Sequence, residues 1–319
     1  MSKYPFPPLD FTNLKTIPIR ARGGKVRVED FATPYQKGSG LGAWFESLPR
    51  VLAADWFRAL IEALIAARSA QKPVLWGLGG HVIKCGLAPV LLDLAARGYA
   101  TAFVLNGAAA IHDFEIAIAG QTSEDVDAVL PDGRFGTAEE TGREMNRAIT
   151  EGDRDGLGMG EALGRCLEQL ADSQFARYSL LAGAYRSATP LTVHVALGTD
   201  TPHTHPETDP AAIGRATYHD FRLFCSLVAQ LNEGGVYLNV GSAVLLPEVF
   251  LKAVSVVRNL GNPLANFTTV NLDFLEHYRP RVNVVERPHA RAGGRGISLR
   301  GHHELMLPLI AAALIEREP

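Results

Sequence analysis

From residue 51 onward, short apolar runs alternate with longer amphipathic stretches. The runs have the length of buried strands, and the amphipathic stretches place apolar side chains at helical spacing. The expected strands lie at residues 73–76, 101–105, 191–197, 236–240, 267–270 and 282–286. The expected helices lie at residues 55–70, 82–96, 160–171, 174–187, 218–232 and 246–260, with one from a capping box at 137–140 to residue 149 and a last one from about His303.

This order of elements predicts an α/β fold, with a Rossmann-like, mostly parallel sheet and helices on both faces. Residues 1–50 are rich in Pro and Gly, and we expect an N-terminal arm that wraps the domain or a partner subunit. Residues 51–319 contain no low-complexity linker and are expected to form a single nucleotide-binding-type α/β domain.

Two stretches of the domain share one pattern. Residues 73–113 and 234–274 each run from a strand through a glycine tip and a helix to a second strand that ends in asparagine. Gly79 then corresponds to Gly241, and Asn106 to Asn271. The pattern indicates either two related halves or a coincidence between ordinary α/β segments.

Ligands of parallel sheets bind at the carboxyl ends of the strands, and polar groups gather after the second expected strand. Small residues there allow a ligand to approach the backbone, and the N–H groups of the next helix can bind an anion. His112 could move a proton, while Asp113 and Glu115 could hold a ribose or a cationic substrate. The alternatives are an Asp113 that caps a helix, a solvated Glu115 and a His112 packed against the sheet.

The loop at residues 198–210 is the second polar cluster, with Asp200, His203, His205 and Asp209. His203 and His205 could bind a divalent metal together with a carboxylate, because imidazole and carboxylate suit zinc, manganese or iron. A catalytic loop without metal, and a structural loop of turn-forming residues, are equally open interpretations.

Two further groups are weaker candidates. His302, His303 and Glu304, with the Arg- and Gly-rich loop at 291–296, could form a phosphate- or carboxylate-binding nest or simply begin a helix. Lys84 could form an imine if it lies at a dry strand tip, although an exposed lysine is the commoner case.

Composition narrows the class of protein. The chain of 319 residues is 47% hydrophobic and 20% charged, as in ordinary globular proteins. A net charge of −3 gives no reason to expect nucleic acid binding. The N-terminus has no apolar signal-peptide core, and the apolar run at 305–315 is too short to span a membrane. Three sparse cysteines (Cys85, Cys166 and Cys225) are typical of reduced, buried thiols in a cytoplasmic protein.

Several segments resemble the deoxyhypusine synthase family, and more closely its bacterial deoxyhypusine synthase-like branch. VLNGAAAIHDFEIAIAG resembles the family's TAGG segment and acidic pair, VHVALGTDTPHTH its ALTDGSLGD loop, and VYLNVGSAVLLPEVF its ILGGGVVKHH turn. The resemblance implies that Ala108 contacts the cofactor and that Asp113 and Glu115 are the acidic pair. Asp200 would be the first aspartate of the loop, and His205 would replace the second. It also implies NAD binding and a homotetramer with sites at the interfaces.

The family's lysine chemistry is not expected here. Its catalytic lysine lies in a W-G-K segment near the C-terminus, whereas the last lysine of this chain is Lys252. The catalytic histidine of the family's turn is also missing, because residues 243–247 are apolar. We therefore expect no transfer through a lysine imine.

The expected function is that of a deoxyhypusine synthase-like enzyme that binds NAD and acts on a small polar metabolite by proton or hydride transfer. The alternatives are a metal-dependent hydrolase or lyase using His203 and His205, and a non-catalytic nucleotide-binding protein. The catalytic candidates are His112, Asp113, Glu115, Asp200 and His205. The cofactor-binding candidates are Gly79, Gly80, Asn106, Gly107, Ala108, Gly241 and Ser242.

Overall fold

In the computed structural model, which describes residues 3–170 and 173–318, a six-stranded sheet has the order β3-β2-β1-β4-β5-β6. Every neighbouring pair of strands is parallel. The predicted parallel α/β fold is thus confirmed, and the strand order is that of the Rossmann fold. The strands are β1 Val74–Leu78, β2 Ala102–Asn106, β3 Leu191–His194, β4 Val236–Val240, β5 Thr268–Asp273 and β6 Arg295–Arg300.

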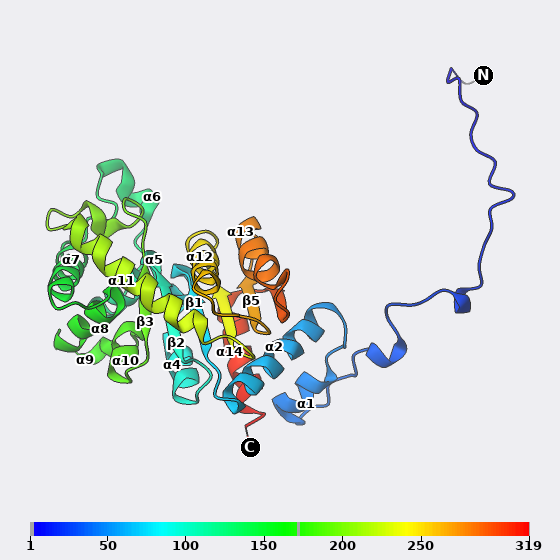
Figure 1. The fold of residues 1–319 in the computed structure, drawn as a ribbon, viewed down its shortest axis with the longest axis horizontal. Helices are drawn as coiled ribbons and strands as arrows, with labels where there is room; N and C mark the ends of the chain where they lie inside the picture. The colour runs from blue at the N-terminus through cyan, green and yellow to red at the C-terminus, as the bar shows by residue number, and fades with distance from the viewer. Residues whose placement is uncertain (1–2, 171–172, 319) are drawn as a thin grey trace.

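Helices cover both faces of the sheet, as expected (Figure 1). The first seven are α1 Gly40–Ser47, α2 Leu52–Ser69, α3 Gly80–Lys84, α4 Ala88–Ala96, α5 Gly107–Ala119, α6 Val126–Val129 and α7 Glu139–Arg154. Those that follow are α8 Met159–Gln169, α9 Ser173–Ala176, α10 Leu180–Arg186, α11 Pro210–Ala229, α12 Leu245–Asn259, α13 Tyr278–Pro280 and α14 His303–Ile315.

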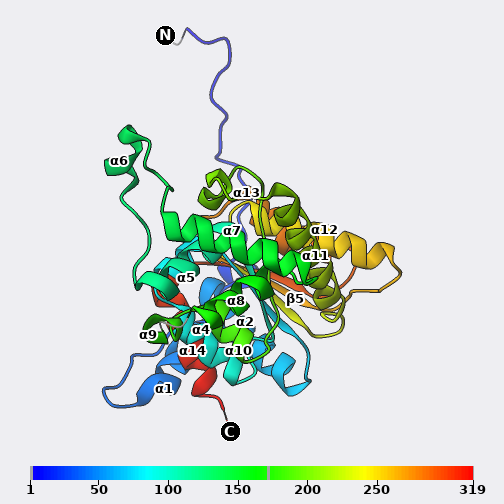
Figure 2. The same cartoon turned by 90° about the vertical axis from the view of Figure 1, so that its left-hand side faces the viewer.

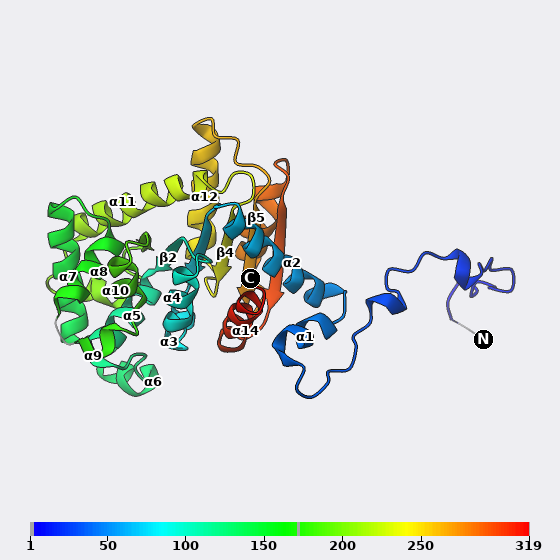
Figure 3. The same ribbon diagram turned by 90° about the horizontal axis from the view of Figure 1, so that it is seen from below.

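The apolar core has two parts because alternate residues of each strand face opposite sides of the sheet. On one side, Trp76 of β1 packs in the cluster that contains α2, α4, α5 and α14. On the other side, Leu75 packs with α11 and α12, including Phe224 and Phe250. Helices α7 to α10 form a lobe beyond the β3 edge (Figures 1 and 3). The sheet therefore lies between two packed layers of helices.

The prediction for residues 282–286 was wrong. This segment is a π-helical turn, Arg281–Glu286, and the sixth strand is β6, which begins inside the region expected to be a loop. A short run of Val residues fits either a strand or a buried helical turn, and here Val282 and Val284 are buried in the turn. β6 alternates instead between exposed and buried positions, as an edge strand does.

Several helix boundaries also differ from the prediction. The helix expected at 82–96 is divided into α3 and α4, since Gly86 has φ +78° between them. The helix at 174–187 is divided into α9 and α10, because Ser179 caps the start of α10. The capping box at 137–140 does not form, since the N-cap of α7 is Ala138 and makes no side-chain bond. Residue 171, the expected end of another helix, lies outside the described residues.

The N-terminal segment runs away from the domain (Figures 1 and 2). Residues 3–39 are almost entirely exposed, and the chain first joins the core at α1, where Phe45 is buried. The arm therefore does not wrap its own domain, whereas contact with a partner subunit stays a prediction. Within the described ranges, no helix is both long and apolar enough to cross a membrane.

Candidate functional site

The glycine tips that follow β1 and β4 meet at the point where the strand order reverses. Leu78 pairs with Val240 in register, and the N–H of Gly79 donates to Val240 O at 2.9 Å. A Cβ on Gly79 would lie 1.9 Å from Gly241 O, so no side chain fits there. Gly241 has φ +68°, which favours glycine on backbone grounds. The structure brings both predicted tips to the switch point, where ligands of such sheets bind.

A buried asparagine pair supports the second tip. Asn239 of β4 and Asn271 of β5 are paired in register, and Asn239 Nδ2 donates to Asn271 Oδ1 and to Ser242 O, both at 2.9 Å. Ser242 Oγ accepts from Leu246 N at 3.2 Å at the start of α12. Asn271 was expected at the end of its strand but lies inside β5. Sequence reasoning missed Asn239, although a polar residue within an apolar strand was the available signal.

The turn from β2 into α5 contacts the first tip. Asn106 caps α5, because its Oδ1 accepts from Ala109 N at 2.9 Å. A Cβ on Gly80 would lie 3.0 Å from the Cβ of Ala108 and 3.1 Å from Cδ2 of His112. Gly80, Ala108 and His112 are thus neighbours at the carboxyl edge of the sheet.

His112 belongs to a relay of three side chains. Its Nδ1 lies 2.7 Å from Thr122 Oγ1, and Thr122 Oγ1 donates to Glu115 Oε2 at 2.5 Å. Since that hydroxyl donates to Glu115, it accepts the proton on His112 Nδ1, which leaves Nε2 as an acceptor. Burial lowers the pKa of His112, against the opposing effect of Glu115. Thr141 of α7 also donates to Glu115, at 3.3 Å. No sequence pattern pointed to Thr122 or Thr141.

Asp113 points into the helical lobe. Its carboxylate is fully buried and accepts from Ser179 Oγ at 2.5 Å, Leu180 N at 2.7 Å and Leu181 N at 2.9 Å. Burial raises the pKa of Asp113 to about 6, although these three donors oppose the rise. Asp113 holds the start of α10 and does not cap its own helix, whose N-cap is Asn106.

Asp200 reaches the same edge from the loop after β3. A Cβ on Gly107 would lie 2.1 Å from Asp200 Oδ2, so the carboxylate fills the space beside the first residue of α5. Oδ2 is buried and has no hydrogen-bond partner. Burial raises the pKa of this carboxyl, and His203 opposes the rise from 4.0 Å away. An unpaired buried acceptor is a position where a ligand donor would be stabilised.

His203 and His205 have separate partners. His203 Nδ1 accepts from Gly198 N at 3.2 Å, whereas His205 Nε2 lies 3.5 Å from Glu139 Oε2 on α7. Within residues 3–170 and 173–318, the side chains close enough together to hold a metal ion are His81, Cys85 and Glu304. His203 and His205 do not belong to this group. The predicted metal alternative at His203 and His205 is therefore not supported.

The Arg- and Gly-rich loop and the histidine pair lie at opposite ends of β6. Arg295 begins the strand, and His302 and His303 follow its last residue, Arg300. They cannot form the single anion-binding nest that was considered from the sequence. Lys84 is exposed at the end of α3, and its charge is near enough to lower the pKa of His112.

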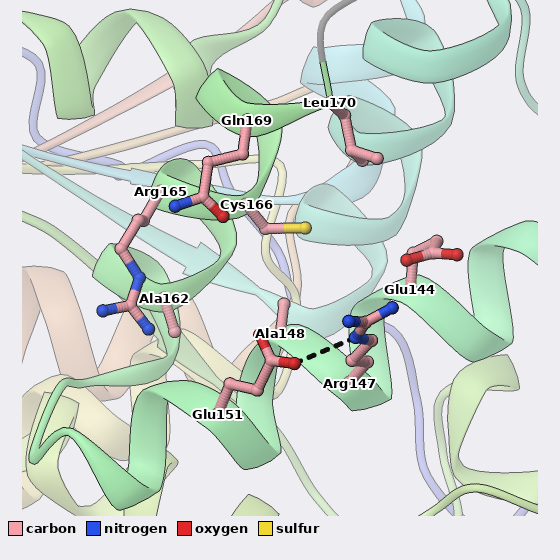
Figure 4. Close-up of a pocket in the computed structure, with 9 residues that line it drawn as sticks. All are labelled: Glu144, Arg147, Ala148, Glu151, Ala162, Arg165, Cys166, Gln169 and Leu170. Carbon is pink, nitrogen blue, oxygen red and sulfur yellow. Dashed lines mark hydrogen bonds and ion pairs between the residues drawn. The ribbon is translucent and has the colours of Figure 1, made fainter.

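Two hollows contain none of the predicted site residues. The first, of about 190 Å³, lies between α7 and α8 (Figure 4). Arg147 and Glu151 form an ion pair of 2.9 Å at its wall, where Glu144 and Arg165 also lie, so it has no excess charge of one sign. The second, of about 390 Å³, is lined by Tyr35, Gly40, Leu41, Trp44 and Leu309.

No protein-family model matches the chain, and a search of curated proteins found no match. Among solved structures, a candidate deoxyhypusine synthase from Entamoeba histolytica is similar, with a TM-score of 0.52, 12% identity, and coverage of 90% of this chain and 96% of that one. Unliganded AgrE gives a TM-score of 0.51 and 16% identity, with 90% of this chain and 34% of AgrE covered. AgrE in complex with ornithine and NAD+ gives a TM-score of 0.50 and 16% identity, with 84% of this chain and 34% of AgrE covered.

The chain spans about a third of the length of AgrE. At these identities the likeness concerns the fold alone. The protein therefore has a Rossmann-like α/β fold of the deoxyhypusine synthase-like type, which a part of AgrE also resembles.

Proposed function

We propose that the protein is an NAD-binding enzyme that acts on a small polar metabolite by proton or hydride transfer, without a lysine imine. The relay from His112 through Thr122 to Glu115, placed beside the glycine tip of β1, is the observation that carries the proposal. A histidine oriented by a hydrogen bond at the ligand edge of a Rossmann-like sheet is suited to proton transfer.

The residues at the edge fit NAD. Gly79, Gly80, Gly107 and Gly241 carry no side chain at the switch point, where Gly241 O fills the space beside Gly79 and the Asp200 carboxylate fills that beside Gly107. α5 begins there, but the carboxylate of Asp200 already lies beside its N-terminus, so the phosphates of NAD would bind along the glycine tips instead. The unpaired Oδ2 of Asp200 could accept from a ribose hydroxyl or an amine. Bound NAD would supply a hydride acceptor or donor.

The chain's own residues would then divide the remaining work. Nε2 of His112 would take a proton from the substrate, while Thr122 and Glu115 hold the ring in one tautomer and stabilise the resulting charge. Asp200 would hold a hydroxyl or amine group, and Asp113 would act only by positioning α10. His205, which contacts Glu139 of α7, would form part of the wall of the site.

Substrate class and assembly are also part of the proposal. AgrE was solved with ornithine and NAD+, and its variant with L-arginine, so amino acids with a basic side chain are the first compounds to test here. We also propose the homotetramer that the sequence resemblance implies, with the exposed arm of one chain covering another.

The experiment is a calorimetric NAD titration of the full chain. Replacing Asp200 with Ala should weaken binding by about 10- to 100-fold, the cost of a hydrogen bond to a charged group. Asp127→Asn, an exposed change on α6, is the control and should leave the affinity unchanged. An unmodified chain that does not bind NAD would overturn the proposal.

A His112→Gln variant distinguishes the enzyme from a non-catalytic nucleotide-binding protein. It should retain NAD binding and lose at least about 100-fold in turnover of any substrate found in the screen. Equal turnover by the variant and the wild type would remove His112 from the mechanism.

A further inference from the structure

A second group of chemically active side chains lies on the other side of the β1 tip. His81 lies in α3 and Cys85 is the C-cap residue of that helix, four positions later, so the two side chains point to the same side. Glu304 lies in the first turn of α14, directly after β6. The fold brings the three together because the chain leaves both β1 and β6 at the same edge of the sheet.

The three side chains converge closely. Cys85 Sγ lies 3.4 Å from His81 Nε2 and 3.9 Å from Glu304 Oε2, and one ligand atom from each residue lies within 4.8 Å of the others. A tetrahedral zinc ion with ordinary bond lengths separates its sulfur, nitrogen and oxygen ligands by roughly 3.3–3.6 Å. The side chain of Glu304 is 47% exposed and contacts His302 Nδ1 only at 3.8 Å, so a small movement would close the remaining gap.

The electrostatics of the group favour a cation over a nucleophilic cysteine. Burial and the nearby Glu304 both raise the pKa of the Cys85 thiol. A catalytic cysteine needs surroundings that stabilise the thiolate, whereas here the carboxylate contacts the thiol directly. A divalent cation between them would replace the proton that Cys85 Sγ donates to Glu304 and would stabilise the thiolate.

A buried histidine lies beside the group. His303 is fully buried beside the group, its ring 5.5 Å from that of His81, and its Nδ1 has no hydrogen-bond partner. The Phe274 ring packs against His81 at 5.5 Å and against His302 at 5.9 Å. Buried polar atoms are normally satisfied by a protein group, a water or an ion.

We propose that His81, Cys85 and Glu304 bind a divalent metal ion of the zinc class, through one imidazole, one thiolate and one carboxylate. Three protein ligands leave a fourth position open to solvent. The ion would tie α14 to the segment that follows the β1 tip. This site is distinct from the proposed NAD site and its existence does not depend on NAD binding.

The test uses Co²⁺, whose thiolate complexes have a strong charge-transfer absorption in the near ultraviolet. Metal-free full-length protein should bind one Co²⁺ per chain with this absorption, and one equivalent of Zn²⁺ should remove it. Cys85→Ser should abolish the absorption, and His81→Ala should weaken Co²⁺ binding by at least about 100-fold. Cys225→Ser removes another free, half-buried thiol and should change neither result.

Thiol labelling of the wild-type protein avoids any dependence on the folding of variants. Zn²⁺ should protect Cys85, identified by peptide mass, from a small alkylating reagent and leave the labelling of Cys225 unchanged. Absence of the thiolate absorption, its retention in Cys85→Ser, or equal protection of both cysteines would overturn the proposal. NAD titrations with and without Zn²⁺ test the two sites separately.

Discussion

The carboxylate of Asp200 occupies the space in which a side chain on Gly107 would begin. A Cβ on Gly107 would lie 2.1 Å from Asp200 Oδ2 and 2.7 Å from Oδ1. The two residues meet because β2 and β3 are paired in register up to Asn106 and His194, just before the loop that carries Asp200. The carboxylate therefore lies beside the N-terminus of α5, where the helix dipole favours negative charge.

Gly107→Ala should move this carboxylate out of place. We expect a loss of about 1–3 kcal/mol in the free energy of unfolding, as in other overpacked sites, and a weaker NAD affinity. Gly214→Ala on α11 is the matched control, because a Cβ there meets nothing within 4 Å. It should stabilise the protein by about 0.5–1 kcal/mol and leave the affinity unchanged. Urea unfolding and calorimetry measure both quantities, and equal behaviour of the two variants would contradict the assignment.

The charge state of His112 should respond to its neighbours in opposite directions. Burial holds the pKa of His112 below 6.5, Glu115 raises it and Lys84 lowers it. Glu115→Gln should therefore lower this pKa further, and Lys84→Met should raise it. Ring-proton NMR titration, with the His112 signal assigned from His112→Gln, measures both. A higher pKa in Glu115→Gln would show that the relay is not formed in solution.

Asp220 of α11 should make stability depend on pH. It is buried, its Oδ2 accepts from Gly160 N at 2.9 Å and Val193 N at 2.7 Å, and burial raises its pKa to about 7. Because the folded-state pKa exceeds the unfolded value, the folded protein holds the proton more tightly. The stabilisation is complete below about pH 4 and is lost as the pH rises to 7.

Asp220→Asn removes this titration, while its amide oxygen can still accept from both N–H groups. The wild-type advantage in the free energy of unfolding should therefore fall between pH 4 and pH 7, as measured by urea unfolding. Burial lowers the pKa of His194 to about 3, so this residue changes the stability in the opposite direction over part of the same pH range. The quantity to follow is therefore the difference in the free energy of unfolding between the wild type and Asp220→Asn, because His194 affects both proteins equally. A constant difference would show that Asp220 keeps one protonation state throughout.

The arm should be needed for assembly. Among its exposed side chains are Phe6, Leu9, Phe11, Leu14, Ile17, Ile19, Val26, Val28 and Phe31. So many exposed apolar groups are typical of a segment that another chain covers. The full chain should sediment as a tetramer, and a chain lacking residues 1–34 as a smaller species. Identical sedimentation of the two chains would exclude this role for the arm.

The local pattern was sufficient for much of the fold. Apolar runs and helical spacing predicted five of the six strands, and glycine composition located the tips at Gly79 and Gly241. These features depend only on a few consecutive residues, so they can be predicted from the sequence. The same locality explains the error at residues 282–286, since a short apolar run does not distinguish a strand from a buried helical turn.

The hydrogen-bond and ion-pair partners of the polar side chains could not be predicted from the sequence. Asp113 and His112 are adjacent in the chain, yet one holds α10 and the other pairs with Thr122 at the sheet edge. Cys85 meets Glu304 from the far end of the chain. By itself the sequence determined most of the order of elements and the positions of the glycine tips, because both follow from local periodicity and turn chemistry. Only the tertiary structure decided which charges are buried, paired or left open, because that depends on packing between distant segments.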